Sequence, residues 1–324
     1  MENILVTGGA GYIGSHVVEQ LIKLKKKVFI IDNLSTGHRK LINKKAKFFL
    51  GDITKFKDVN FLISQNKISS IVHLAASLSV NESERKPKKY QKNNVIGTKN
   101  LVKAAIRNKV NNFIFSSTCA VYRDKLKIVS EKSKLLPKSV YGKTKLEGEK
   151  LISRFFKNSK TKFAILRYFN VAGASQSKKV GQITNGDQLF KNLAITSLNK
   201  KPQINVYGND YNTKDGTCIR DYIHVSDIAK IHILALKNIS REKKSIILNC
   251  GYGKGVSVME AIKEFENQIK KKITINFRKR RKGDMEMIIA NNKKIKKILG
   301  WKVKKNNLKN IVESSIKWEI IRRY

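Results

Sequence analysis

Residues 4–14 read Ile-Leu-Val-Thr-Gly-Gly-Ala-Gly-Tyr-Ile-Gly, and this stretch decides the fold of the chain. It opens with an apolar run, which predicts a buried β-strand. In the segment that follows, Val17, Leu21 and Leu24 fall on one face of a helix. The stretch therefore predicts a strand, a glycine-rich turn and a helix in direct succession.

Glycine recurs at every third position of this turn, at Gly8, Gly11 and Gly14. A backbone without Cβ atoms can turn sharply, approach a pyrophosphate closely and let the helix pack on a sheet. The N-terminus of the helix then faces the anion. We predict a dinucleotide-binding turn, and favour it over a glycine-rich turn without a ligand.

A second predicted strand, residues 27–31, ends in Asp32. Asp32 follows the glycines at the spacing where a carboxylate meets the adenosine ribose of a bound dinucleotide. A carboxylate repels a 2′-phosphate, and Asn33 rather than an arginine comes next. The sequence therefore favours NAD over NADP.

At 324 residues the chain can form one large or two small domains with a sizeable core. It lacks the run of about 18 apolar residues that a membrane helix needs. The first strand begins within four residues of Met1, so we expect neither a membrane span nor a signal peptide. The cysteines Cys119, Cys218 and Cys250 are odd in number and far apart, which suits a reducing cytoplasm and no metal site.

The net charge of +44 would ordinarily indicate nucleic acid or an anionic membrane as a partner. The lysines, however, are spread over nearly every surface segment and form no single arm or tail. This distribution is typical of an AT-rich coding bias that acts on exposed positions. The densest basic run is Arg-Lys-Arg-Arg-Lys at residues 278–282. We favour the bias over a nucleic-acid function.

Two further strands are predicted at residues 46–50 and 68–74. Asp52 and Ile53 follow the first of them, and Asp52 either accepts a hydrogen bond from an adenine amine or caps a helix. Ala75 and Ala76 follow the second, and their small side chains leave room for a cofactor.

Residues 90–106 predict one long helix, and residues 110–115 a fifth strand that ends in Ser116, Ser117 and Thr118. Hydroxyl groups at the C-terminal end of a strand lie where open α/β sheets bind ligands. Ordinary hydrogen bonding at a strand end is an equally good interpretation of this cluster alone.

Tyr141 and Lys145 are four residues apart in Tyr-Gly-Lys-Thr-Lys. If this segment is helical, the two side chains share one face about 5–6 Å apart at Cβ. A nearby ammonium lowers the pKa of a phenol from about 10, so the pair can supply a base near neutral pH. In a lysine-rich chain the motif by itself is more often a solvated helix face.

The later chain predicts a smaller set of elements on the substrate side of the molecule. Ser257 to Glu260 matches a capping box, which opens a helix. The other expected elements are a helix at 187–198, a strand at 204–206, a turn-rich loop at 210–220, segments 226–236 and 246–248 that return to the sheet region, and two small helices that end near Trp301 and Tyr324. We expect an α/β fold: a doubly wound parallel sheet over most of residues 1–180 with segments of about 218–250 returning to it, and a smaller interleaved C-terminal substrate domain over most of 181–324.

The glycine turn, Asp32, the Ser-Ser-Thr strand end and Tyr141-x-x-x-Lys145, in this order, resemble the extended short-chain dehydrogenase/reductase family. Other segments resemble one branch of it, the UDP-glucose 4-epimerases. They are Gly-Tyr-Ile-Gly-Ser-His at 11–16, Lys-Asn-Asn-Val-Ile-Gly-Thr at 92–98, Leu-Arg-Tyr-Phe-Asn at 166–170, Asp-Gly-Thr-Cys-Ile-Arg-Asp-Tyr-Ile-His-Val at 215–225, Arg-Lys-Gly-Asp at 281–284 and Leu-Gly-Trp at 299–301. The similarity spans residues 3–301 and implies a Rossmann fold.

The resemblance implies roles for the matching positions. Tyr141 would be the catalytic acid and base, Lys145 its electrostatic partner and the anchor of the nicotinamide ribose, and Thr118 the hydroxyl on the 4-oxygen of the sugar. The UDP moiety would bind Asn170, Arg220, Arg281 and Asp284, alongside Thr118 and Tyr141 at the sugar. The implied NAD contacts are Gly8, Gly11, Tyr12, Ile13, Gly14, Asp32, Asn33, Asp52, Ile53, Leu74, Ala75, Ala76, Asn93, Ser116, Tyr141, Lys145 and Tyr168. Family analogy also implies a homodimer that pairs the helices beginning at Tyr90 and Tyr141.

The implied reaction interconverts UDP-galactose and UDP-glucose by oxidising C4 to a ketone and returning hydride to the opposite face. Related dehydratases and decarboxylases carry an acidic residue where this chain has Cys119-Ala120-Val121-Tyr122, so redox-neutral epimerisation is favoured. Cys119 is either reactive or, as we favour, a small buried hydrophobe.

Two departures from the branch concern cofactor grip and sugar size. Leu78 stands where many members carry a lysine near the cofactor, and branched Ile288 suggests little room for an N-acetyl group. A 4-epimerase or C4-reductase for another UDP-sugar, such as a UDP-pentose or a UDP-N-acetylhexosamine, therefore stays open. A nucleic-acid-binding protein with a Rossmann core is a more remote alternative.

Overall fold

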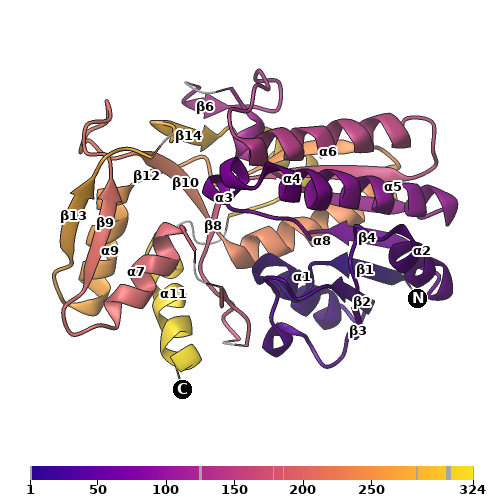
Figure 1. Ribbon diagram of the computed structural model, residues 1–324, viewed down its shortest axis with the longest axis horizontal. Coiled ribbons are helices and arrows are strands. Elements are labelled where there is room, and N and C mark those ends of the chain that lie inside the picture. The colour runs from indigo at the N-terminus through magenta and orange to yellow at the C-terminus, as the bar shows by residue number, and fades with distance from the viewer. Residues whose placement is uncertain are drawn as a thin grey trace.

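The structure is a computed structural model that describes residues 2–123, 126–177, 179–184, 186–281, 284–303 and 308–323. Lys282, Gly283 and Tyr324, named above, lie outside the described residues. Figure 1 shows a sheet with flanking helices around the N-terminal half and, beside it, a second group of elements from the later chain. In the part of the chain that the structure describes, no helix is long and apolar enough to cross a bilayer.

The main sheet has seven parallel strands in the order β11-β7-β5-β4-β1-β2-β3. The chain winds outward from β1 in one direction and returns to the other side of β1 with β4, which makes the sheet doubly wound. This confirms the predicted fold class. The strands are β1 (Asn3–Thr7), β2 (Lys27–Asp32), β3 (Lys47–Leu50), β4 (Ser70–His73), β5 (Asn112–Thr118), β7 (Lys162–Tyr168) and β11 (Ile246–Cys250).

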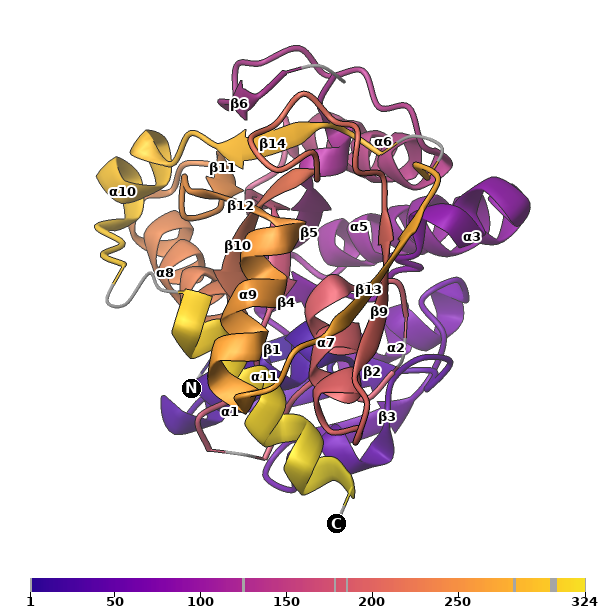
Figure 2. The same cartoon turned by 90° about the vertical axis from the view of Figure 1, so that its left-hand side faces the viewer.

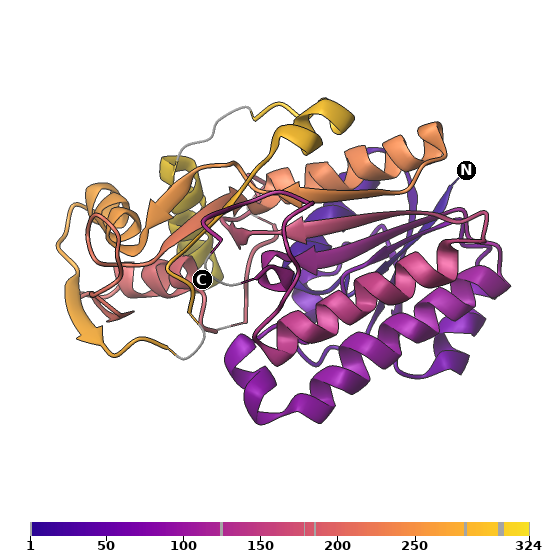
Figure 3. The same ribbon diagram turned by 90° about the horizontal axis from the view of Figure 1, so that it is seen from above.

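Helices cover both faces of this sheet, as Figure 3 shows from above. Alternate residues of a strand point to opposite faces, so Ile4 and Val6 of β1 join the core on one side and Leu5 the core on the other. One face carries α1 (Tyr12–Lys23) and α8 (Val225–Glu242); the other carries α2 (Phe56–Gln65), α5 (Gly97–Arg107) and α6 (Val140–Phe156). Segments 226–236 and 246–248 thus return to the sheet, as α8 and β11.

The later elements form two smaller sheets. A five-stranded sheet contains β12 (Gly255–Ser257), β10 (Ile219–His224), β14 (Met287–Ala290), β6 (Ile128–Val129) and β8 (Asn170–Ala172), and a two-stranded sheet pairs β9 (Gln203–Tyr207) with β13 (Thr274–Arg278). The helices α7 (Leu189–Ser197), α9 (Val258–Ile269) and α11 (Leu308–Arg323) pack together beside them (Figure 2). The predicted capping box opens α9. Of the two helices expected to be small, α10 (Lys293–Leu299) is short, but α11 is not.

The helix predicted over residues 90–106 is not a single α-helix. It consists of the end of α4 (Pro87–Tyr90), a π-helical segment η2 (Gln91–Ile96) and α5. The extra residue per turn in η2 rotates Asn93 and Asn94 toward the loop after β4, and π-turns of this kind are frequent at functional sites. Three further short helices, not predicted, are η1 (Arg39–Leu41), α3 (Val80–Arg85) and η3 (Cys119–Val121).

A buried ion pair joins α6 to the sheet. The guanidinium of Arg167 on β7 donates from Nε to Glu149 Oε1 at 2.9 Å and from Nη2 to Oε2 at 2.7 Å, and Ser117 donates to the same carboxylate at 2.5 Å. The two side chains are only 3% and 5% exposed. Arg167 also donates to Tyr122, whose hydroxyl donates to Asn249. The network fixes the helix that carries Tyr141 and Lys145 against β5 and β7.

Glu149→Gln removes the negative charge and leaves Arg167 buried without compensation. We expect the free energy of unfolding to fall by about 3–5 kcal/mol, measured by urea denaturation followed by circular dichroism. Glu147→Gln, on the exposed face of the same helix, is the matched control and should change it by less than about 0.5 kcal/mol. Equal losses in the two variants would contradict this account of the pair.

Candidate functional site

The glycine turn after β1 presses its backbone against the end of β4. Gly8 has a φ of +70°, and a Cβ on it would lie 2.7 Å from Ala75 N. A Cβ on Gly14 would overlap the carbonyl oxygen of Gly8. Helix α1 begins directly after Gly11, and among the described residues no side chain caps its first N–H groups. The turn thus combines a shallow backbone cradle with a helix N-terminus available to an anion, which fits a pyrophosphate.

Asp32 lies at the end of β2, beside this turn. Its Oδ2 accepts a hydrogen bond from Ala10 N at 3.0 Å, and its Oδ1 accepts one from Leu34 N at 2.9 Å. Burial raises the pKa of the carboxyl, although both N–H bonds act in the opposite direction. A carboxylate has about four acceptor positions, so capacity remains for the two hydroxyls of a ribose. The geometry fits the predicted dinucleotide.

Asp52 and Asn33 meet at the ends of β3 and β2. Asp52 Oδ1 accepts from Thr54 N at 2.8 Å, and the Asn33 side chain hydrogen-bonds the same carboxylate. Burial opposes these bonds, but together they hold the pKa of Asp52 below its usual value. The N-cap of α2 is Lys55, so the alternative in which Asp52 caps a helix is wrong. Ile53 is buried beneath this corner.

The loop after β4, with Leu74, Ala75 and Ala76, forms the opposite edge of the turn. The hydroxyl oxygen of Thr7 lies 3.2 Å from both Leu74 N and Ala75 N and 2.8 Å from His73 Nδ1. These contacts keep the loop close to the end of β1, at the point where the winding of the sheet reverses. Ligands bind at such switch points in open α/β sheets.

Two asparagines of η2 hold the same loop. Asn93 donates to Ser77 Oγ at 3.1 Å, and Asn94 accepts from Ser77 N at 2.8 Å. Asn94 also donates to Thr144 Oγ1 of α6 at 3.1 Å, and it is buried. Sequence reasoning selected Asn93 and missed Asn94, which joins the cofactor loop to the helix of Tyr141. Its position inside one of the quoted family motifs was the available signal.

Tyr141 lies in the first turn of α6, which Ser139 caps by accepting from Gly142 N at 3.0 Å. Tyr141 N donates to Ser83 Oγ of α3 at 3.1 Å. The Tyr141 phenol lies next to the hydroxyl of Thr118, the last residue of β5, and this hydroxyl favours the charged form of the phenol. The strand end and the helix therefore lie together, and Ser116 is buried in the same strand end.

The expected lowering of the pKa of Tyr141 by Lys145 is wrong for the chain alone. Removal of the phenol from water disfavours the phenolate and raises the pKa of Tyr141 to about 12. The neighbouring Thr118 hydroxyl lowers this pKa in part. Lys145 is itself buried, with Nζ 4.4 Å from the centre of the Phe115 ring. Burial lowers the pKa of Lys145 to about 7, while the charge of Glu149 raises it. The lysine is thus only partly charged at neutral pH.

The hydroxyls of Tyr12 and Tyr168 already have partners inside the protein. Tyr168 OH lies 2.6 Å from Nε2 of His232 on α8, and Tyr12 OH donates to the carbonyl of Gly173 at 2.5 Å. The Ile13 side chain packs against the core. Any cofactor contact of Tyr12 or Tyr168 would therefore involve atoms other than these two hydroxyls.

The basic and acidic residues expected to hold UDP lie together. Arg220 Nη2 on β10 is 4.0 Å from Asp284 Oδ1, and the guanidinium of Arg281 lies 3.8 Å from the centre of the Tyr207 ring. Burial raises the pKa of Asp284, while the charges of Arg220 and Arg281 lower it. Asn170 on β8 pairs with Tyr222 of β10. A cationic group with an aromatic wall can bind an anionic nucleotide.

Arg220 also connects this group to the strand end of Thr118. Its charge lowers the pKa of the neighbouring Cys119, but burial dominates and raises that pKa to about 12. The thiol therefore stays protonated near neutral pH, which supports a small hydrophobe over a reactive cysteine. Ile288 is buried against Val121, Tyr122 and Phe169, and Leu78 is 59% exposed.

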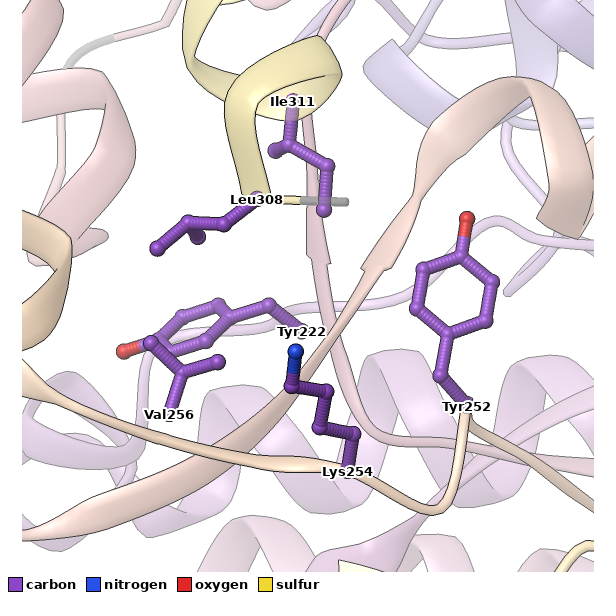
Figure 4. Close-up of a pocket in the computed structure, with 6 residues that line it drawn as sticks. All are labelled: Tyr222, Tyr252, Lys254, Val256, Leu308 and Ile311. Atoms are coloured by element: carbon purple, nitrogen blue, oxygen red, sulfur yellow. The ribbon is translucent and has the colours of Figure 1, made fainter. Parts of the chain in front are cut away.

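A small cavity of about 20 Å³ lies elsewhere, between β10, β12 and the start of α11 (Figure 4). It has room for about one water molecule and not for a nucleotide. It is lined by Tyr222, Tyr252, Lys254, Val256, Leu308 and Ile311. Among the described residues, no cluster of three or more His, Cys, Asp or Glu side chains could hold a metal ion.

Residues 4–251 match the NAD dependent epimerase/dehydratase family. The chain belongs to this family. A UDP-glucose 4-epimerase of Azospirillum brasilense is 38% identical over 318 residues, which cover 98% of this chain and 91% of that protein.

Two solved structures of the family extend the comparison. A UDP-glucose-4-epimerase from Stenotrophomonas maltophila, with bound NAD and formylated UDP-arabinopyranose, matches with a TM-score of 0.95 and 33% identity over 100% of this chain and 99% of that one. The UDP-Glc/GlcNAc 4-epimerase of Campylobacter jejuni matches with a TM-score of 0.86 and 39% identity over 99% and 100%. The family is NAD dependent, which agrees with the cofactor predicted from Asp32.

The protein environment of the partly buried Tyr141 phenol has a measurable consequence in the NAD-free protein. We expect its phenol to ionise with a pKa of about 12, so it stays protonated through neutral pH. The measurement is the ultraviolet tyrosinate difference between the native protein and Tyr141→Phe during an alkaline titration. A difference signal that develops below pH about 9, under the ordinary phenol value of about 10, would contradict this environment.

Proposed function

We propose that this chain is a UDP-glucose 4-epimerase that interconverts UDP-galactose and UDP-glucose through a 4-keto sugar, with NAD tightly bound. The observation that carries the proposal is the placement of Tyr141, in the first turn of α6, next to Thr118, at the carboxyl end of β5 in a doubly wound sheet. This pair has the glycine turn of the family on the same edge and the Arg220 group next to it.

Tyr141 is proposed to take the proton from the 4-hydroxyl of the sugar and to return it after hydride has come back. Thr118 hydrogen-bonds the same sugar oxygen and orients it toward the phenol. Bound NAD supplies the hydride acceptor and a positively charged ring, beside which a phenol ionises more easily than in the chain alone. Lys145 holds the nicotinamide ribose, and its charge adds to the stabilisation of the phenolate.

The substrate residues are proposed to divide their work unequally between nucleotide and sugar. Arg220, Arg281, Asp284 and Asn170 hold the UDP moiety, since a diphosphate needs paired positive charge. The hexose meets chiefly Thr118 and Tyr141, so it can turn its other face to the cofactor while the nucleotide stays bound. Strong anchoring at one end is what allows rotation at the other.

The organisation of the protein follows from these roles. We propose that residues 1–180, with about 218–250, form the NAD domain and that 181–324 mainly bind the UDP-sugar. The cofactor contacts are those given under Sequence analysis, apart from the Tyr12 and Tyr168 hydroxyls. We further propose a cytoplasmic homodimer that pairs α5 and α6 and acts in galactose metabolism, with neither a membrane nor a nucleic acid as partner.

Two relatives indicate UDP-sugars other than UDP-glucose and UDP-galactose as possible further substrates. The Campylobacter jejuni protein is named for glucose and N-acetylglucosamine forms, and the Stenotrophomonas maltophila protein holds a UDP-pentose derivative. The buried, branched Ile288 argues for the unacetylated hexose as the preferred one.

Product analysis with UDP-galactose and no added cofactor tests the proposal. We expect UDP-glucose to form, because each turnover returns the hydride and leaves the bound cofactor unchanged. Parallel reactions with UDP-N-acetylgalactosamine and UDP-xylose rank the alternatives. A requirement for stoichiometric NADH would indicate a reductase instead, and tight, steeply salt-dependent binding to DNA without sugar conversion would indicate a nucleic-acid binder.

Tyr141→Phe removes the proton carrier and leaves the ring. We expect the turnover number to fall by about 10²- to 10⁴-fold, with NAD and UDP still bound. Kinetics of UDP-galactose conversion measure the loss. Tyr211→Phe, which removes a buried hydroxyl that has no hydrogen-bond partner among the described residues, is the control and should leave turnover within a few-fold of native. Native turnover in Tyr141→Phe would exclude the assigned chemistry.

A further inference from the structure

The glycine turn is tied to the late part of the chain through a single tyrosine. Tyr12 is the first residue of α1, and its hydroxyl donates to the carbonyl of Gly173 at 2.5 Å. Its ring stands edge-on to His16 of the next helical turn, with 5.5 Å between ring centres. Because no side chain caps the start of α1, this bond is an external support for the end of the helix that meets the pyrophosphate.

Gly173 occupies a site where no other residue fits. Its φ is +91°, and a Cβ there would lie 2.8 Å from the His224 ring and 2.9 Å from Ser314 Oγ. The peptide that accepts the Tyr12 hydrogen bond is therefore enclosed by one side chain at the end of β10 and one from α11. The position of the Gly173 carbonyl depends on those two side chains.

The Ser314 hydroxyl makes all the hydrogen bonds that it can make. It donates to Ile311 O at 3.0 Å and accepts from Ala174 N at 3.2 Å. His224 Nδ1 accepts from Ser226 N at 3.1 Å, so the ring proton is on Nε2, which lies 3.1 Å from Ser314 Oγ and donates to it. One donor and two acceptor positions are thus all used.

Helix α11 is itself held firmly on the substrate side. Lys191 of α7 forms a buried ion pair with Glu319 of α11, and Trp318 Nε1 donates to Gln182 O at 2.9 Å. At its other end, Leu308 and Ile311 face Tyr222 and Tyr252 across the small cavity in Figure 4. The helix therefore presents Ser314 to Gly173 from a fixed position.

We propose that Ser314 is a positioning residue for the cofactor: through His224 and the Gly173 peptide it holds Tyr12, and with it the start of α1, in the orientation that binds the pyrophosphate of NAD. The inference rests on the proposed function, because it requires NAD at the glycine turn. It predicts that a hydroxyl on α11, outside the glycine turn, controls how long NAD stays bound.

Ser314→Ala and Ser315→Ala are matched variants for the test. Ser315 also donates to Ile311 O, at 2.8 Å, and is buried, but none of its hydrogen bonds reaches Gly173 or His224. With the NAD-loaded full chain, we expect Ser314→Ala to release NAD about three- to tenfold faster, the worth of one hydrogen bond. Ser315→Ala should match the native release rate, and UDP affinity should stay within about twofold in both variants.

Tyr12→Phe cuts the same connection at its other end and completes a double-mutant cycle. We expect its release rate to resemble that of Ser314→Ala, and the double variant to release NAD no faster than either single variant. Thermal unfolding of all variants separates this effect from a general loss of stability.

Three results would overturn the inference. They are equal NAD release from Ser314→Ala and Ser315→Ala, additive losses in the double variant, and equal weakening of NAD and UDP binding by Ser314→Ala. A native protein with no affinity for NAD would instead contradict the proposed function, and the inference with it.

Discussion

The close approach of two backbones, Gly8 to Ala75, is the constraint on which the site depends. Strands β1 and β4 are neighbours although the chain reaches β4 only after building β2 and β3. At their carboxyl ends the connections leave in opposite directions, and the missing Cβ of Gly8 lets them pass in contact. The Thr7 hydroxyl then closes the junction through Leu74 and Ala75. Asp32, η2 and the first turn of α6 are arranged around this point.

Beneath the site, buried polar side chains compensate one another's charge or hydrogen-bonding groups. Arg167 and Glu149 satisfy each other under α6, and His73 links Thr7 to Thr98 through both ring nitrogens. Burial lowers the pKa of Lys145, and the charge of Glu149, which already pairs with Arg167, only partly offsets this effect. An ion pair anchors α6, whereas Lys145, which we propose holds the nicotinamide ribose, can change its charge when a ligand binds. The two buried charges thus differ in how far the protein compensates them.

Local patterns predicted the fold well because each apolar run or glycine spacing was enough to predict its own element. The apolar runs around residues 28–31 and 71–74 gave the strands, and the spacing of Gly8, Gly11 and Gly14 gave the turn. The family resemblance implied that Thr118 and Tyr141 act on the same sugar oxygen, and the structure places the two side chains next to each other. The π-helical turn at Asn93 and Asn94 was not predicted, because one extra residue shifts the face of a helix without changing which residues are apolar.

Properties that depend on residues far apart in the sequence could not be predicted from local sequence patterns. The Tyr168 hydroxyl bonds to His232, 64 residues further on, and no local feature of either residue indicates this. The pKa of Tyr141 depends on how many protein atoms surround the phenol, which spacing to Lys145 does not report. The bonds from Tyr12 to Gly173 and from Ala174 to Ser314 span 161 and 140 residues.

These two long-range hydrogen bonds affect the order in which the protein folds during translation. A ribosome releases Tyr12 long before Gly173, and Gly173 long before Ser314, so the glycine turn proposed to bind the pyrophosphate lacks these bonds during most of translation. A nascent chain would collapse around its first strands with this corner still loose. The slower release of NAD that we propose for the complete fold would then arise only once α11 has docked, late in biogenesis.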